Sequence, residues 1–361
     1  LRSLAGQLRE LPPLPPRATG KSYDDAIVLN AAMSTVIKEL FANTGPTGQR
    51  VIGRLTEKLR AEVDATIAGD VIGRSRAYGE AVAAHILAWS KGDGGALIEN
   101  LGFPTAYELA DGPGHWVPTS TIALQQMPLL PDWGSRRTLA MPDGAACPLP
   151  PPPAYSEDKS SEFYSEAVEV YDTQRTLSSE QQLIARFWSD DPMLSPTPPG
   201  HWISIALDIF SRDHTKFDHR VDILARLGVA MSDAFVGCWN VKYQYDLLRP
   251  VTYIRKLIDA NWEPLLIPPP FPEYPSGHST LSGAAAEVLT AQLGDNLAFD
   301  DQTHVRDAIP VRHFERFWAA AEEAAMSRLY GGIHFRSAVR RGLDQGRCVG
   351  GYANALKTKG G

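Results

Sequence analysis

Residues 216–247 read KFDHRVDILARLGVAMSDAFVGCWNVKYQYDL. Apolar side chains recur every three or four positions along this stretch, at Val221, Leu224, Leu227, Met231, Phe235 and Trp239. A period of this length is typical of a helix with one buried face. We therefore expect one long helix over this stretch.

Helical periodicity also dominates on both sides of this segment, whereas strand alternation is scarce. The pair Gly331–Gly332 predicts a helix end, because glycine favours the position that follows the last helical residue. The other expected helices lie within residues 24–90, after His278, and over residues 312–330 and 336–356. We therefore predict an all-α fold, with two four-helix-bundle-like halves around one site.

A proline-rich stretch separates the helical segments. Prolines recur from residue 113 to the run Pro150–Pro153, and proline at this density forbids helix interiors and favours extended surface chain. The sequence thus predicts three parts: an N-terminal helical half, residues 1–110; a connecting arm that wraps the outside, residues 111–155; and a catalytic helical half, residues 156–361.

Composition bounds the function. The chain has 361 residues, of which 43% are apolar and 21% charged, and a net charge of −7. A nucleic-acid partner is therefore not expected, and any anion site must be local. No apolar run reaches the roughly 18 residues of a membrane helix, so no membrane span is predicted.

Three cysteines allow at most one internal disulfide, and none are paired at metal-ligand spacing. Whether Cys147 pairs with Cys348 stays open at this point. The first residue is Leu1 rather than Met, which is compatible with a removed export signal. An exported protein, periplasmic or secreted, is the expectation.

The first candidate site block is Lys242 with Arg249–Pro250. Two residues seven apart on a helix point within roughly 20° of the same direction, so both cations are expected on one side of the long helix. Pro250 is expected to end that helix. Taken alone, such a pair is more often a solvated basic face.

The second block is Pro275–Ser276–Gly277–His278. It predicts a helix start, where unpaired backbone N–H groups and the helix dipole favour an anion and glycine allows close approach. His278 would then stand beside that anion as an acid or base. The alternative is a serine cap followed by a surface histidine.

The third block is Ser327–Arg328 followed by His334. The glycine break between them allows the chain to reverse, which can bring guanidinium and imidazole to one point. Arginine offers a planar fork of donors for the oxygens of phosphate or vanadate. The alternative is an arginine that caps its own helix.

The three blocks together resemble the signature of the type 2 phosphatidic acid phosphatase superfamily. Details around them resemble its bacterial-type vanadium-dependent haloperoxidases, most clearly from about residue 188 to residue 352. The matching stretches are Pro128–Gly134, Phe187–Trp188 with Asp191, Pro198–Trp202, Trp239, and Phe271–Pro272 followed by Tyr274–His278.

This resemblance implies a vanadate cofactor, and phosphate is expected to fit the same site. His334 would bind the metal through a ring nitrogen. The groups that would neutralise or bind the vanadate oxygens are Lys242, Arg249, Ser276, Gly277 and Arg328.

The resemblance also implies catalytic roles. His278 would act as acid and base, Lys242 would polarise a peroxide oxygen, and Asp191 would pair with Arg328. The halide pocket would be lined by Trp239 and Phe271. The expected partners are hydrogen peroxide, halide and a small organic acceptor, and a homodimer is a possible assembly.

Two other functions stay open from the sequence. A soluble acid phosphatase or diphosphatase would use His334 as the nucleophile of a phosphohistidine, with His278 protonating the leaving group. A non-catalytic oxyanion-binding protein would bind without turnover. The superfamily often carries an acid four residues after the final histidine, and the residue there is Ala338. Loss of an orienting acid weakens a nucleophile more than a metal ligand, which favours vanadium.

The remaining histidines are expected to be structural or exposed. They include His201, His214, His219, His304 and His313. Of these, His201 alone merits mutation, because it lies in the Pro198–Trp202 stretch.

Overall fold

The computed structural model describes residues 6–64, 67, 69–95, 107–120, 126–191 and 195–358. These ranges contain eleven α-helices and one two-stranded sheet, so the predicted all-α fold is confirmed. None of the described helices is long and apolar enough to cross a membrane.

The chain forms two compact units, residues 1–94 with 357–361, and residues 95–356. The second unit therefore includes the proline-rich arm together with the predicted catalytic half. The three-part division expected from the sequence stays a prediction.

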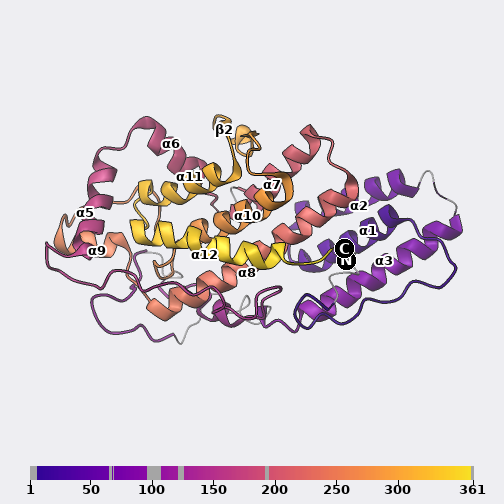
Figure 1. Cartoon of the computed structure of the whole chain (residues 1–361), viewed down its shortest axis with the longest axis horizontal. Helices are drawn as coiled ribbons and strands as arrows, with labels where there is room; N and C mark the ends of the chain where they lie inside the picture. Colours follow the sequence, from indigo (N-terminus) through magenta and orange to yellow (C-terminus); the bar gives the residue numbers. More distant parts are fainter. Residues whose placement is uncertain are drawn as a thin grey trace. The chain divides into compact units, whose positions relative to one another are not determined.

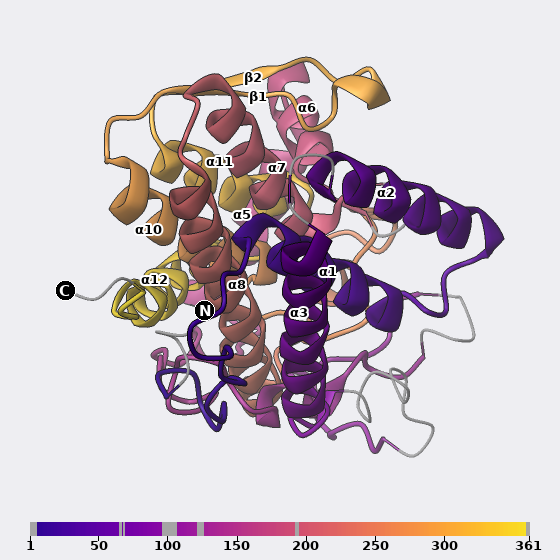
Figure 2. The same cartoon turned by 90° about the vertical axis from the view of Figure 1, so that its right-hand side faces the viewer.

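The first unit holds α1 (Asp25–Leu40), α2 (Pro46–Asp64) and α3 (Gly69–Ser90). Asp24 begins α1 by accepting a hydrogen bond from the Ile27 amide. Helices α1 and α3 lie side by side (Figure 2), and Gly79 permits their close approach, since a Cβ there would lie 2.4 Å from the Val28 oxygen. No residue of α2 is buried.

The second unit is built around one central helix, α10. Helices α7, α8, α11 and α12 all pack against α10 or against one another (Figure 1). The helices of this unit are α5 (Glu162–Arg175), α6 (Ser179–Phe187), α7 (Thr197–Arg212), α8 (Phe217–Tyr245), α9 (Pro250–Leu257), α10 (Gly277–Leu293), α11 (Phe317–Tyr330) and α12 (Arg336–Asn354). The expected long helix thus corresponds to α8, and the expected break at Gly331–Gly332 lies between α11 and α12.

Three glycines of α12, spaced four apart, allow it to approach α10 closely. A Cβ at Gly346 would lie 2.2 Å from the Thr280 oxygen, and one at Gly342 would lie 2.5 Å from the Ser279 Cβ. Gly350 similarly faces α10. The contact brings the start of α10, with His278, near the start of α12, which follows His334.

A short antiparallel sheet corrects one expectation. Strands β1 (Phe299–Asp301) and β2 (Arg312–Phe314) pair so that Phe299 lies opposite Phe314. The helix predicted from residue 312 therefore begins only at Phe317. Pairing of the two phenylalanine rings, 5.6 Å apart, stabilises the strand instead.

The proline-rich arm is tied to the helices of its own unit. It contains one short 3-10 helix, η2 (Pro131–Ser135). The Asp233 carboxylate of α8 accepts hydrogen bonds from the amides of Leu139, Ala140 and Met141. A disulfide joins Cys147 of the arm to Cys348 of α12, which answers the question that the sequence left open.

Candidate functional site

The three sequence blocks converge in the second unit, at the junction of α8, α9, α10, α11 and α12. Lys242 lies near the end of α8, Arg249 precedes α9, and His278 lies in the first turn of α10. Arg328 belongs to the last turn of α11. His334 lies just before α12, and its Nε2 is 3.1 Å from Nη1 of Arg249.

The predicted reason for the convergence of Lys242 and Arg249 was wrong. Helix α8 ends at Tyr245, where Asp246 adopts a left-handed conformation with φ 46°. Pro250 begins α9 rather than ending α8, in agreement with the preference of proline for the first helical position. The break between α8 and α9, not a shared helix face, therefore sets how the two cations lie.

His334 is held in one tautomer by a carboxylate. Its Nδ1 is 2.8 Å from Oε1 of Glu273, so Nδ1 carries the proton that this carboxylate accepts. Nε2 then carries the lone pair and accepts a hydrogen bond from Arg249 Nη1 at 3.1 Å; this tautomer is the form of histidine that binds a metal through Nε2. Burial, together with Arg249, Lys242 and Arg328, lowers the pKa of His334 well below its usual value.

Glu273 is the site residue that the sequence analysis missed. It also accepts a hydrogen bond from the Phe335 amide at 2.8 Å. The sequence has Ala338 where the superfamily often has an acid, but His334 is still oriented by a carboxylate, because Glu273 supplies it from the loop before α10. Ala338 therefore does not favour a metal ligand over a nucleophile at His334. The available signal was the position of Glu273 inside the stretch 271–278.

Lys242 faces backbone oxygens. Its Nζ donates to the carbonyls of Pro272 and Glu273, each at 2.9 Å, and to that of Pro275 at 2.5 Å. Burial lowers the pKa of Lys242 to about 7, while three acceptors favour the form with three N–H donors. Lys242 therefore holds the loop that precedes α10. Its side chain does not line the cavity, but its charge contributes to the lowered pKa of His334.

Arg249 combines fixed and unpaired donors. Nε donates to the Phe271 oxygen at 3.0 Å and Nη1 to the Ile333 oxygen at 2.9 Å. Its buried Nη2 has no hydrogen-bond partner within the described chain. Burial lowers the pKa of Arg249 to about 10, which leaves the guanidinium charged at neutral pH.

The start of α10 matches the expectation for a helix N-terminus. Ser276 is the N-cap, and its Oγ accepts a hydrogen bond from the Ser279 amide at 3.3 Å. Ser276 is fully buried, whereas Gly277 lines the cavity described below. The backbone of Gly277 is thus available to an anion, and the Ser276 oxygen is already used as an acceptor.

His278 is partly buried and neutral. Burial and the charge of Arg328 lower its pKa to about 3. The Ser189 backbone lies close to the ring and opposes part of this shift, and Nε2 has no partner among the described residues. An unprotonated, unpaired ring nitrogen in this position can accept a proton.

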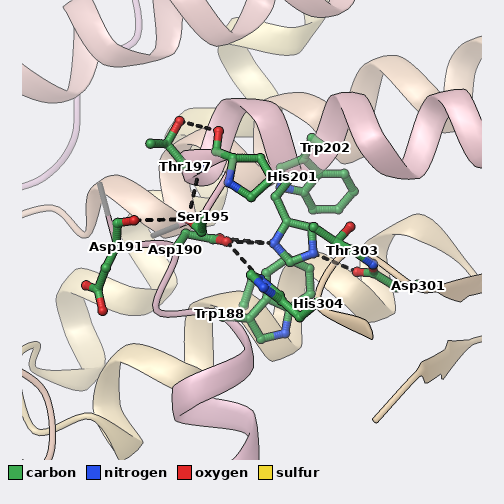
Figure 3. Close-up of polar contacts among 12 residues, drawn as sticks. Trp188, Asp190, Asp191, Ser195, Thr197, His201, Trp202, Asp301, Thr303 and His304 are labelled. Carbon is green, nitrogen blue, oxygen red and sulfur yellow. Dashed lines mark hydrogen bonds and ion pairs between the residues drawn. The ribbon is translucent and has the colours of Figure 1, made fainter. Parts of the chain in front are cut away.

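Arg328 is held by backbone oxygens rather than by Asp191. Its Nη2 donates to the Trp188 oxygen at 2.6 Å and to the Ala185 oxygen at 3.2 Å. The predicted Asp191–Arg328 ion pair is not among the close ion pairs of the described residues, but the charge of Asp191 still acts on Arg328, opposing the lowering of its pKa; the pairing stays a prediction. Asp190 adopts a left-handed conformation, with φ 50°, and its carboxylate contacts His201, whereas the Asp191 carboxylate points away from His201 (Figure 3).

A cavity of about 460 Å³ lies in front of these groups. Gly277, His278, Arg328 and His334 line its polar end, and Asp191 also borders it. The other walls are largely apolar and include Leu129, Phe235, Trp239, Phe271, Leu266 and Ile333. The predicted halide-side residues Trp239 and Phe271 pack together there, with ring centroids 4.9 Å apart.

The donor set fits a tetrahedral oxyanion such as vanadate. The Arg328 guanidinium and the start of α10 line the same cavity as His334, and the Arg249 guanidinium contacts His334. Unpaired buried N–H groups are unfavourable without a ligand. Arg249 Nη2 is such a group. The imidazole of His334 supplies a nitrogen ligand at the same point.

Comparisons with known proteins agree with this geometry. Residues 222–359 match the family model of the VCPO second helical-bundle domain. Vanadium chloroperoxidase of Curvularia inaequalis is 27% identical over 165 residues, which are 32% of this chain and 27% of that protein. The chain thus spans about a quarter of that curated relative.

Solved structures give fuller coverage. A bacterial vanadium-dependent iodoperoxidase superposes with a TM-score of 0.88 at 38% identity, covering 98% of this chain and 85% of that chain. A holo-type bacterial vanadium-dependent chloroperoxidase has a TM-score of 0.72 at 17% identity, with coverage of 98% and 88%. The second likeness concerns the fold alone.

Proposed function

Because this chain belongs to the vanadium-dependent haloperoxidase family, we propose that it uses vanadate to oxidise a halide with hydrogen peroxide. The balanced reaction combines halide, hydrogen peroxide and one proton to give hypohalous acid and water. The observation that carries the proposal is the His334 imidazole, whose Nδ1 is held by Glu273 while Nε2 faces Arg249.

The protein residues have separate roles in this proposal. His334 Nε2 would bind the metal, and Arg249, Arg328 and the Gly277 amide would bind the oxyanion. Bound vanadium(V) would act as a Lewis acid that activates peroxide toward the halide. His278 Nε2 would accept the proton of the incoming peroxide, and its lowered pKa keeps it in the base form.

Iodide is the halide that we propose for this site, since the iodoperoxidase is 38% identical over nearly the whole chain. The apolar walls of the cavity suit a small organic acceptor with an aromatic or aliphatic body. The Cys147–Cys348 disulfide supports export, because disulfides persist in oxidising compartments.

A homodimer is a further part of the proposal. Helix α2 exposes an apolar stripe with a spacing of four residues, Val51, Leu55 and Leu59. Burial of such a stripe against a second copy would remove apolar surface from water. Light scattering after size-exclusion chromatography, with Leu55→Glu as the variant, tests this: a monomeric wild type would contradict it.

The test of function is a reconstitution. The full chain is incubated with orthovanadate, and peroxide-dependent oxidation of iodide, bromide and chloride is measured in parallel. Hydrolysis of p-nitrophenyl phosphate is measured with vanadate absent. His334→Ala should abolish halide oxidation, whereas His313→Ala, at an exposed histidine, should not. Phosphate release without any halide oxidation would contradict the proposal and support a phosphatase.

A further inference from the structure

A buried network of two histidines and three carboxylates lies beside the site and takes no part in the roles above. His201 lies between two carboxylates (Figure 3): Nδ1 is 2.9 Å from Oδ1 of Asp190, and Nε2 is 2.8 Å from Oδ2 of Asp301. His304 is second in the network, with Nε2 3.3 Å from Asp190 Oδ1 and Nδ1 3.0 Å from Asp307 Oδ2. All but Asp307 are buried.

Each ring nitrogen of His201 faces a carboxylate oxygen, which can only accept a hydrogen bond. Both nitrogens must therefore be donors, and the ring is an imidazolium. Although burial opposes its charge, the hydrogen bonds to Asp190 and Asp301 raise the pKa of His201 to about 9. The charged His201 ring is held by a hydrogen bond on each side, and such bonds are strong in the low-dielectric interior. We call this fixed ring the anchor.

This anchor is connected to the segment 188–190 at two points. The His201 ring stacks on the Trp188 ring, with centroids 4.4 Å apart and planes inclined by 18°. It also holds the side chain of Asp190, which follows Ser189 in a left-handed turn. Because His201 holds the Asp190 side chain, it also restrains the backbone of Trp188 and Ser189, the two residues that precede Asp190.

The same short segment positions two groups of the active site. The Trp188 oxygen accepts a hydrogen bond from Arg328 Nη2 at 2.6 Å, and the Ser189 backbone lies close to the His278 ring, beside which Ser189 lines the cavity. Two adjacent backbone groups thus orient the arginine that would bind the oxyanion and the histidine that would serve as base.

We propose that His201 is a positioning residue: through its hydrogen bond to Asp190 it holds the 188–190 backbone, and that backbone orients Arg328 and His278 toward the oxyanion. The proposal rests on the proposed function for its effect on vanadate. Its structural part is independent of it.

The same atoms could instead surround a cation, since the ligand atoms of Asp190, His201 and His304 lie within 4.8 Å of one another. The hydrogen-bonded arrangement is favoured because every ring nitrogen already faces a carboxylate at hydrogen-bond distance. A metal at this point would need a lone pair from each ring. Elemental analysis of the purified protein decides this, and one divalent ion per chain that His201→Phe removes would overturn the proposal.

Two variants separate the hydrogen bond from simple packing. His201→Asn places an amide N–H near the position of Nδ1 and loses the ring, whereas His201→Phe keeps a ring on Trp188 and loses both donors. His313→Gln is the matched control, because His313 also contacts two carboxylates, Asp300 and Glu315, but is exposed. Each variant is checked for folding by circular dichroism.

The first measurement is hydrogen–deuterium exchange of the peptide that covers residues 185–191. Faster exchange is expected in His201→Phe and near wild-type exchange in His201→Asn and His313→Gln. The reverse order for the two His201 variants would assign the role to ring packing and refute the proposal. If His201→Phe fails to fold, Asp190→Asn provides the same test, with faster exchange expected.

The second measurement is the dissociation constant for orthovanadate by calorimetry. Loss of a positioning partner typically weakens binding by about tenfold to a hundredfold, and this is expected for His201→Phe. A wild type that binds no vanadate and oxidises no halide would refute the proposed function, while the exchange data would still decide the role of His201. Wild-type affinity in His201→Phe would refute the positioning role alone.

Discussion

Replacement of Glu273 by glutamine tests how the site prepares its metal-binding histidine. Glutamine keeps an acceptor oxygen for the Nδ1–H of His334 and for the Phe335 amide, but it removes the negative charge. A hydrogen bond to a charged group contributes about 1 kcal/mol more than a neutral one. Vanadate should therefore bind roughly fivefold more weakly, slightly below the range for partners of metal ligands.

The assay is the dissociation constant for orthovanadate, measured at pH 8.5. Burial raises the pKa of Glu273 to about 8, so the wild-type carboxylate is mostly ionised at this pH. Glu166→Gln is the matched control, because Glu166 also accepts hydrogen bonds near the start of α12, from the amide and hydroxyl of Ser337, without contact to His334. An affinity of Glu273→Gln within twofold of wild type would refute the reasoning.

Three further outcomes are expected. Gly346→Ala places a Cβ 2.2 Å from the Thr280 oxygen, which should cost about 1–3 kcal/mol of unfolding free energy. Gly351→Ala, also in α12 but with nothing within 4 Å, should not lower the melting temperature, since alanine favours a helix over glycine. Reduction of the Cys147–Cys348 disulfide should destabilise the chain by about 2–5 kcal/mol in urea titrations, and unchanged midpoints would contradict this. Because the folded pKa of His278 is about 3 and its unfolded value about 6.5, the folded state binds fewer protons between these values. The unfolding free energy should fall by about 1.4 kcal/mol per pH unit on acidification in that window, and His278→Gln should reduce this slope.

The sequence alone identified the main helices and most of the charged residues of the site, although not Glu273. Helical periodicity, the glycine break and the three blocks are local signals, so α8, the start of α10 and the separation of α11 from α12 were predicted close to their observed bounds. The blocks also identified His278, Arg328 and His334, which the structure brings to one cavity. The roles of these residues stay predictions until they are measured.

The hydrogen-bond partners of those residues were decided only by the tertiary structure. Glu273 and His334 are 61 positions apart, and Asp190 and Asp191 are indistinguishable by residue type. The backbone conformation at each acid decides which histidine its carboxylate reaches. Asp190 and Asp246 both have left-handed backbones, and their carboxylates contact His201 and His115. Local sequence determines which helices form and which charges they carry, but packing of distant segments determines which charges meet, because a hydrogen bond requires contact within about 3 Å.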